Sequence, residues 1–186
     1  MSLVSFIVAA IVILVTPGPT NTLLAASGAA MGWRRAALLP VAEAAGYLIA
    51  VTGYLSLASF LAEAGPAMPA LKGIAAAWLF HCAWKLWTQP AQSAAVERSI
   101  ALRRVFLATI LNPKAMLVGA VLIPGMSDGL QHRAVGAFLV LSLAAGVAWT
   151  LGGSLLPRSA RRHAYRAAAV VVGLFSVMAA SSAIAG

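Results

Sequence analysis

The sequence predicts an all-α membrane protein with six transmembrane helices, arranged as two inverted three-helix halves whose first and fourth helices are broken by proline. Three observations lead to this fold class. Of the 186 residues, 62% are apolar and only 9% are charged, against about 25% charged residues in soluble domains. The apolar residues form long continuous runs, close to the roughly 20 residues that one membrane span needs. Basic residues gather in every second connection between these runs.

The composition also excludes several classes of protein. A soluble enzyme of this size could not bury so much apolar surface, and a membrane barrel would alternate apolar and polar residues over segments of about ten. The net charge of +9 does not indicate a nucleic-acid partner, because the basic residues are scattered between apolar runs and form no continuous basic surface. The sequence has no phosphate-binding loop, nucleophile motif or metal-ligand spacing, so neither an enzyme nor a metal or other cofactor is expected.

Six apolar runs remain when the chain is cut at charges and at Pro/Gly clusters. They are Leu3–Ala26, Ala37–Leu61, Ala70–Trp87, Val105–Ile123, Ala134–Leu156 and Ala167–Ala185. The first run is expected to be a span and not a cleaved signal, because no Lys or Arg precedes it. The polar segment 89–103 is the predicted linker between half one (1–88) and half two (104–186) of a single transmembrane domain. Three spans reverse the side on which the chain emerges, so the second half must be inverted.

Basic residues also predict the orientation in the membrane, because short cytoplasmic loops retain Lys and Arg. Ten basic residues lie beside the first, third and fifth connections, beginning with Arg34 and Arg35 and ending with Arg166. Only Lys72 and Arg133 lie beside the second and fourth connections. We therefore expect the odd connections to face the cytoplasm and both termini to face outward.

A polar, proline-containing motif interrupts the first run. Its residues are Thr16, Pro17, Gly18, Pro19, Thr20 and Asn21. Each proline lacks an N–H group, so the carbonyl groups of Ile13 and Val15 lose their helical partners. In hydrocarbon, such groups must be met by protein or by water in a cavity. We interpret the motif as a helix break that lines a substrate cavity; the alternative is a kink that its own Thr and Asn side chains satisfy.

The fourth run repeats this pattern at Asn112, Pro113 and Lys114. Lys114 follows Arg104 by ten residues, about 15 Å along a helix, which places it near the middle of the membrane. An ionisable residue at that depth predicts a functional site. Interrupted helices at matching positions of two halves also indicate the binding site of a transporter.

Glu43 is the only acidic residue inside a predicted span. A carboxyl group in an apolar setting takes up protons readily, which suits proton coupling. Its candidate partners are a substrate amino group and the Lys114 ammonium; in the second case the pair would be a structural tie between the halves. His81, in the third run, is a weaker candidate for a proton relay, because a single buried histidine is more often only hydrogen-bonded.

Several motifs together resemble the LysE/RhtB family of amino-acid exporters. They are Thr16-Pro17-Gly18-Pro19 with Asn21, Gly32-Trp33-Arg34-Arg35-Ala36, Gly46-Tyr47, Ala83-Trp84-Lys85 and Asn112-Pro113-Lys114. Their order and spacing match across essentially the whole chain. The resemblance implies a six-span protein of the bacterial inner membrane that exports amino acids, of the lysine or homoserine/threonine type, or related small metabolites, driven by the proton gradient. The chain departs from the family's usual pattern at Thr20, Glu43 and His81.

The expected partners are therefore an amino-acid substrate, protons and the lipid bilayer, with a homo-oligomer left open. Two alternatives remain: an exporter of another small cation or metabolite, and a membrane enzyme or assembly factor, because a fold does not fix a function. The residues expected to bind the substrate or to couple its transport are Thr16, Pro17, Gly18, Pro19, Thr20, Asn21, Glu43, His81, Asn112, Pro113 and Lys114.

Reporter fusions test the predicted orientation. A reporter that is active only outside the cytoplasm should be active when fused after Gly186, because ten of the twelve basic residues beside connections lie on the odd ones. A fusion after Arg35, in the first connection, is the matched control and should give the opposite result. Strong activity of a cytoplasm-specific reporter at the C-terminus would contradict the inverted three-plus-three arrangement.

Overall fold

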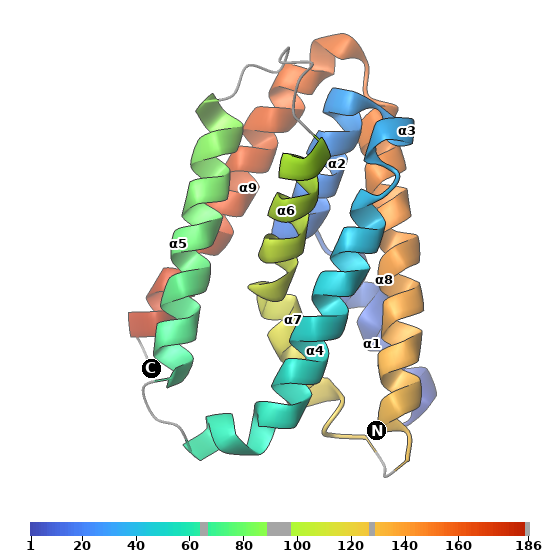
Figure 1. Cartoon of the computed structure of the whole chain (residues 1–186), viewed down its shortest axis with the longest axis vertical. Helices are drawn as coiled ribbons and strands as arrows, with labels where there is room; N and C mark the ends of the chain where they lie inside the picture. Colours follow the sequence, from blue (N-terminus) through green and yellow to red (C-terminus); the bar gives the residue numbers. More distant parts are fainter. Residues whose placement is uncertain (64–66, 89–97, 127–128, 185–186) are drawn as a thin grey trace.

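Helices account for all regular secondary structure in the residues that the computed structural model describes, which are 1–63, 67–88, 98–126 and 129–184. The long helices run side by side along the long axis of the molecule (Figure 1). In chain order the helices are α1 (Leu3–Val15), α2 (Pro19–Met31), α3 (Trp33–Ala36), α4 (Leu39–Glu63), α5 (Ala67–Thr88), α6 (Arg98–Ile110), α7 (Pro113–Leu117), the π-helical segment η1 (Val118–Leu122), α8 (Gln131–Ser154) and α9 (Arg158–Ile184).

Three of the described helical segments are long and apolar enough to cross a membrane: Trp33–Ser56, Arg98–Leu122 and Gln131–Ser154. The helices α1 and α2 would make a fourth span if they are counted as one bent helix, since they meet at an angle of 53°. The helices α5 and α9 cover the two other predicted runs but do not meet the same criterion within the described residues. The protein is thus helical with three or four candidate spans, and the six-span arrangement stays a prediction.

Two helices extend further than the apolar runs predict. Helix α6 begins at Arg98, so residues 98–103 of the predicted linker are helical, and α9 begins at Arg158, well before Ala167. An apolar run marks where hydrocarbon begins, whereas a helix continues into polar surroundings wherever its residues favour it, as arginine does. The rest of the predicted linker, 89–97, lies outside the described residues.

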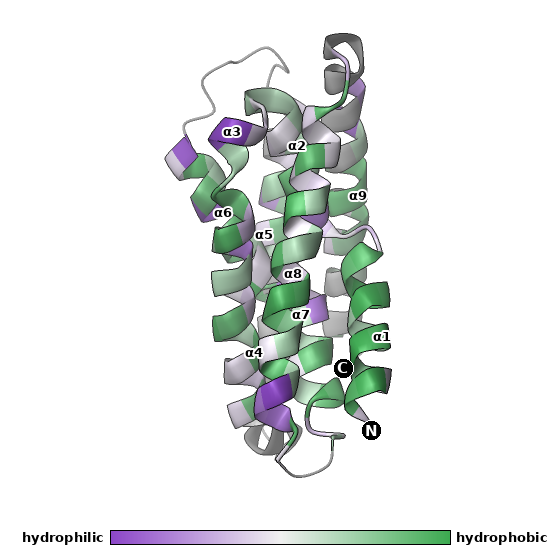
Figure 2. Ribbon diagram, turned by 90° about the vertical axis from the view of Figure 1, so that its right-hand side faces the viewer, coloured by the Kyte–Doolittle hydropathy of each residue, from purple (hydrophilic) through white to green (hydrophobic). Residues whose placement is uncertain are grey.

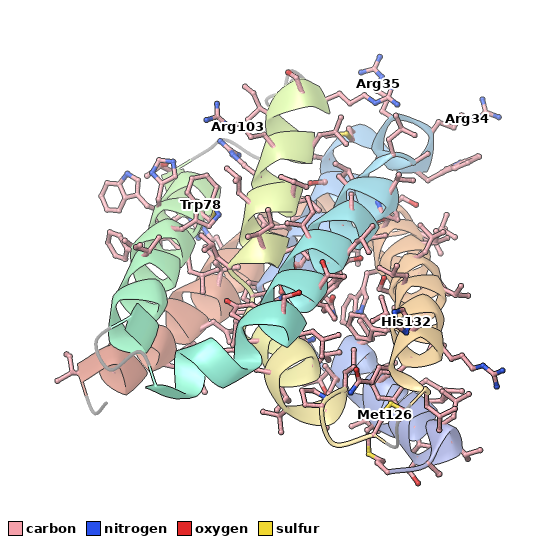
Figure 3. All side chains as sticks on the ribbon, turned by 60° about the horizontal axis from the view of Figure 1, so that its bottom comes forward. Arg34, Arg35, Trp78, Arg103, Met126 and His132 are labelled. Carbon is pink, nitrogen blue, oxygen red and sulfur yellow. The ribbon has the colours of Figure 1, made fainter. Side chains whose placement is uncertain are left out.

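The basic connections gather at one end of the bundle. Helix α3, with Arg34 and Arg35, lies at the upper end of Figure 1 together with the first turns of α6 and α9, and the N-terminus lies toward the lower end. Figure 3 shows Arg34, Arg35 and Arg103 at one end and His132 and Met126 at the other. Positive charge is therefore segregated along the bundle axis, in the way that membrane insertion segregates Lys and Arg.

Two buried apolar clusters form the core, one toward each end of the bundle. The upper cluster joins α2, α5, α6 and α9 through side chains that include Leu24, Leu79 and Val105. The lower cluster joins α1, α4, α8 and η1 through side chains that include Phe6 and Phe138. Large apolar side chains also remain exposed on the outside, and Figure 2 shows hydrophobic residues in green along α1 and α8. So extensive an apolar exterior is typical of contact with lipid.

Glycines bring α2 and α8 into close contact. A Cβ atom at Gly153 would overlap the backbone of Ala25, and a Cβ atom at Gly28 would overlap the carbonyl group of Thr150. Because lipid tails are as apolar as the helices themselves, helices in a membrane associate largely through such close packing of small residues. This crossing holds α2, the helix that follows the first proline motif, firmly against α8.

Replacing Gly153 by alanine should lower the thermal unfolding midpoint of the purified protein, because the new Cβ atom would meet backbone atoms of α2. Overpacking of this kind costs about 1–3 kcal/mol. Gly152→Ala is the matched control, since a Cβ atom at Gly152 has nothing within 4 Å. Equal midpoints for the two variants would show that α2 and α8 do not pack as closely as described.

Candidate functional site

The first interruption of the helices lies between α1 and α2. Helix α1 ends at Val15, and Thr16 leaves it with a ψ angle of 127°. Gly18 is extended, and α2 begins at Pro19. Proline is favoured at the first position of a helix, because its missing N–H group would have no helical partner there. The prolines therefore end one helix and begin the next at the same place.

Side chains from three helices satisfy carbonyl groups that this interruption leaves unpaired. The Asn21 amide donates to the carbonyl oxygens of Leu14, at 2.7 Å, and of Thr16, at 3.1 Å. The Trp149 indole N–H also donates to the Leu14 oxygen, at 3.4 Å, and the Lys114 ammonium donates to the Thr16 oxygen. The freed backbone is thus bound by residues of α2, α8 and α7.

The carbonyl groups that accept these bonds differ from those that the prolines alone indicate. Proline geometry points to Ile13 and Val15, whereas the side-chain donors reach Leu14 and Thr16. The chain turns away from the helix axis at Thr16, so carbonyl groups beyond the two opposite the prolines also lose their helical partners. The Thr16 hydroxyl donates to the Val12 carbonyl oxygen at 2.6 Å, so the Thr16 side chain serves its own helix and not the site.

The second interruption lies between α6, which ends at Ile110, and α7, which begins at Pro113. Asn112 caps α7, because its Oδ1 atom accepts from the Lys114 backbone N–H at 3.0 Å. The Asn112 side-chain amide donates to the Thr20 hydroxyl at 2.9 Å and to the Tyr47 hydroxyl at 3.4 Å. The two interruptions are therefore joined directly, by the Asn112–Thr20 bond and by the Lys114–Thr16 bond.

Glu43 lies on α4 with 1% of its surface exposed, and its Oε2 atom has no hydrogen-bond partner. A Cβ atom at Gly146 would overlap Oε2, so α8 approaches the carboxyl group closely. The carboxyl group interacts electrostatically with the Lys114 ammonium. The structure nevertheless gives Glu43 and Lys114 no ion pair within 4.0 Å. An unpartnered carboxyl group in such a place is costly unless a proton or a cation accompanies it.

Six buried side chains form a polar layer across the bundle. They are Thr20, Asn21, Glu43, Thr109, Asn112 and Lys114, each at most 9% exposed. On α4 the layer lies between Leu39 of the upper apolar cluster and Tyr47 of the lower one. Along the fourth predicted span it lies between Ala108 of the upper cluster and Ala115 of the lower one. The polar layer therefore has apolar packing on both sides.

The structure does not bring every predicted residue to the polar layer. His81 is exposed on α5 and stacks on Trp78, with ring centroids 5.7 Å apart. The side chains of Thr16 and Pro17 are also exposed. A site for a metal ion is not apparent either, since the described residues contain no suitable group of three His, Cys, Asp or Glu.

Sequence reasoning missed Thr109, a member of the layer, and two residues that form hydrogen bonds beside it, Tyr47 and Trp149. The Thr109 hydroxyl donates to the Thr20 hydroxyl at 3.5 Å. The Tyr47 hydroxyl accepts from the Asn112 amide, and the Trp149 indole N–H donates to the Leu14 carbonyl oxygen. Helical spacing could have found two of them, because Tyr47 follows Glu43 by four residues and Thr109 precedes Asn112 by three. Nothing in the local sequence indicates that Trp149 reaches the end of α1.

Curated proteins similar to this chain are efflux proteins. Cysteine/O-acetylserine efflux proteins of Salmonella paratyphi A, Salmonella typhi and Salmonella typhimurium are each 27% identical to it over 173 residues, which is 89% of this chain and 88% of each relative. The resemblance to amino-acid exporters is confirmed. No family model matches the chain, and no solved structure does.

The similarity extends over most of the chain. The relatives are transporters and not enzymes, which agrees with the prediction that the chain is not an enzyme. The apolar helices are those expected of a membrane protein, and the curated proteins that the chain resembles are efflux proteins.

Asn21→Ala should destabilise the protein by about 1–3 kcal/mol, because it removes hydrogen bonds from the carbonyl groups of Leu14 and Thr16 in a buried place. Thr22→Val is the matched control. The Thr22 hydroxyl donates to the Gly18 oxygen at 2.7 Å, but that oxygen also accepts from the Thr22 backbone N–H at 2.9 Å and so keeps a partner. Chemical denaturation of both variants in detergent measures the difference; a larger loss in Thr22→Val would contradict the assignment.

Proposed function

We propose that this chain is a secondary transporter that exports cysteine, O-acetylserine or a closely related amino acid across the bacterial inner membrane in exchange for protons. The observation that carries the proposal is the polar layer: a buried ammonium and an unpartnered carboxyl group lie where two helices are interrupted. Interrupted helices that meet in the middle of a membrane protein commonly form the substrate site of a transporter. The substrate class follows from the similar efflux proteins.

The polar layer offers a complementary group to each charge of a zwitterion. The carbonyl oxygen of Thr16 and the carboxyl group of Glu43 are acceptors for a substrate ammonium group. The Lys114 ammonium is a donor for a substrate carboxylate. The first turn of α2 is a second binding position for a substrate carboxylate. Gly18 supplies no side chain to cap this helix, and the helix dipole favours an anion at its N-terminus. An amino acid thus fits the layer better than a simple cation or a simple anion.

The upper and lower apolar clusters would act as the two gates of such a transporter. Each cluster packs between the polar layer and one end of the bundle. Alternating access requires that one cluster opens while the other stays packed, by rocking of one half of the chain against the other. The two inverted halves, with both termini outside the cytoplasm, are the arrangement in which the same motion opens either side.

Glu43 is the residue that we assign to proton coupling. Its buried carboxyl group lacks a hydrogen-bond partner at Oε2, and an isolated buried charge is avoided by neutralisation or by pairing. The group therefore holds a proton when the substrate is absent and faces the substrate ammonium when it is present. Because one carboxyl group binds either a proton or the substrate ammonium group, but not both at once, transport of the substrate in one direction is coupled to transport of a proton in the other.

Transport into inverted membrane vesicles tests the export function. Inverted vesicles that contain the protein should accumulate labelled cysteine or O-acetylserine when the interior is made acidic, as the outside of the cell is. Right-side-out vesicles with the native gradient, whose interior is alkaline, should not. Lysine and threonine serve as comparison substrates and should accumulate less. Absence of gradient-driven accumulation for every amino acid tested would contradict the proposal.

Glu43→Gln should reduce gradient-driven accumulation at least tenfold while the protein remains folded, because glutamine occupies the same space but cannot carry the proton. Glu63→Gln, at the last residue of the same helix, is the matched control and should transport normally. Labelled substrate in inverted vesicles measures transport, and size-exclusion chromatography measures the folded fraction. Normal transport by Glu43→Gln would remove the proton role.

A purely structural role for Glu43 gives a different result. If its carboxylate only balances the Lys114 charge, the single change should lower the unfolding midpoint by leaving a buried charge without compensation. The double variant Glu43→Gln with Lys114→Met should then recover the midpoint. The proton role instead predicts that the single variant keeps its stability and that the double variant regains no transport.

A further inference from the structure

The Lys114 side chain makes an unusual contact for a buried lysine. The Lys114 residue is only 9% exposed, and its ammonium group donates to the backbone carbonyl oxygen of Thr16, which lies 98 residues away in the chain. Buried ammonium groups are normally paired with carboxylates. The nearby carboxyl group of Glu43 forms no ion pair with it, so a freed backbone carbonyl takes that role.

The Thr16 carbonyl oxygen is well suited to bind a cation. It lies just past the end of α1, where the helix dipole places partial negative charge. It also accepts from the Asn21 amide, which fixes its position without filling all of its acceptor capacity. An ammonium group, with three N–H donors in a compact head, is a better partner for such an oxygen than a planar guanidinium group.

We propose that the Thr16 carbonyl oxygen is a binding position for primary ammonium groups, that Lys114 occupies it as a tethered occupant, and that the ammonium group of the transported amino acid displaces Lys114 from it. The assignment of the displacing ligand rests on the proposed function; the position itself rests on the geometry. On displacement, the Lys114 ammonium becomes available to the carboxylate of the same substrate. No covalent bond forms or breaks in this exchange.

Gly18 gives an independent handle on the position. A Cβ atom there would lie 2.9 Å from Cε and 3.0 Å from Nζ of Lys114. The φ angle of Gly18 is −161°, an extended conformation that any residue adopts, so the backbone does not require glycine here. Glycine is required because the Lys114 side chain packs where a Cβ atom would lie. Gly18→Ala should therefore push the ammonium away from Thr16 while it keeps both the backbone and the charge.

The tethered occupant makes the site selective for zwitterions. An amino acid supplies an ammonium group that replaces Lys114 at Thr16 and a carboxylate that receives the displaced lysine. A simple amine supplies only the first of these, so the displaced Lys114 ammonium would gain no substrate carboxylate in place of the Thr16 oxygen. Simple amines should therefore bind the native protein poorly, but should bind well once Lys114 is removed or displaced.

The test measures the thermal unfolding midpoint of the full chain in lipid nanodiscs with ethylammonium chloride as the probe. Tetramethylammonium chloride at the same concentration is the control, since it carries the charge but has no N–H donor. Ethylammonium should raise the midpoint of Lys114→Ala and of Gly18→Ala by about 2–4 °C and should leave the native midpoint unchanged. Arg133→Ala, which removes an exposed cation on α8, should behave as the native protein does.

Either of two results would overturn the inference: an equal response to ethylammonium in all four proteins, or no response in both site variants. If Lys114→Ala does not fold, Gly18→Ala alone decides, because it retains the lysine. The vesicle assay separates this inference from the proposed function. A selective ethylammonium response without amino-acid transport would support the ammonium position and reject the exporter, whereas transport without a selective response would do the reverse.

Discussion

Inside a membrane no water is present to donate a hydrogen bond to a backbone carbonyl group. The first proline motif leaves several carbonyl groups there without a helical partner. The hydrogen bonds that Asn21 and Lys114 make in the polar layer pair these carbonyl groups. Asn21 reaches back to Leu14 and Thr16 from the beginning of the next helix, and Lys114 comes from the other half of the chain. A carbonyl group left unpaired in one helix thus accepts a hydrogen bond from a residue far away in the sequence, and this bond joins the first and second halves of the chain.

The two ionisable residues of the layer are satisfied unequally. The Lys114 ammonium has a hydrogen-bond acceptor, whereas the Oε2 atom of Glu43 has no hydrogen-bond donor, although α8 packs closely against it at Gly146. A buried pair that was purely structural would be expected to bring both charges together. The layer instead keeps them apart and leaves the negative group in need of a partner. This arrangement supports the proposal that a proton or a positive ligand binds at Glu43.

Most helices could be predicted from the sequence, because long apolar runs leave the chain few other structures in a membrane. The predicted runs overlap all the long helices of the structure, and the interruptions at Thr16 and Asn112 lie beside the prolines that indicated them. The helix starts at Arg98 and Arg158 could not be predicted this way, because hydropathy reports the solvent and not the hydrogen bonding of the backbone. The number of spans also depends on which helical segments lie within the membrane, and helix length and composition alone indicate three or four.

The candidate site was predictable in its residue types but not in its contacts. Asn21, Asn112, Lys114 and Glu43 stood out because polar groups are rare in apolar runs, and all four are buried in one layer. His81 stood out for the same reason, yet its side chain is exposed. Sequence composition could not predict this, because it does not tell which side of a helix a residue occupies. Trp149 was missed because its role depends on how α8 crosses α1.

The π-helical segment η1 has a consequence for how such chains are aligned. Between Val118 and Ile123 the backbone hydrogen bond spans five residues, not four, at 3.0 Å, so this turn holds one residue more than an α-helical turn. Each residue of an α-helix turns the chain by about 100°. Lys114, before this turn, faces the first interruption, and Gly119, inside it, packs against the Val51 carbonyl oxygen, 2.6 Å from its would-be Cβ atom. A relative that lacks one residue here would keep a regular helix, and its alignment with this chain should place the gap within residues 118–122.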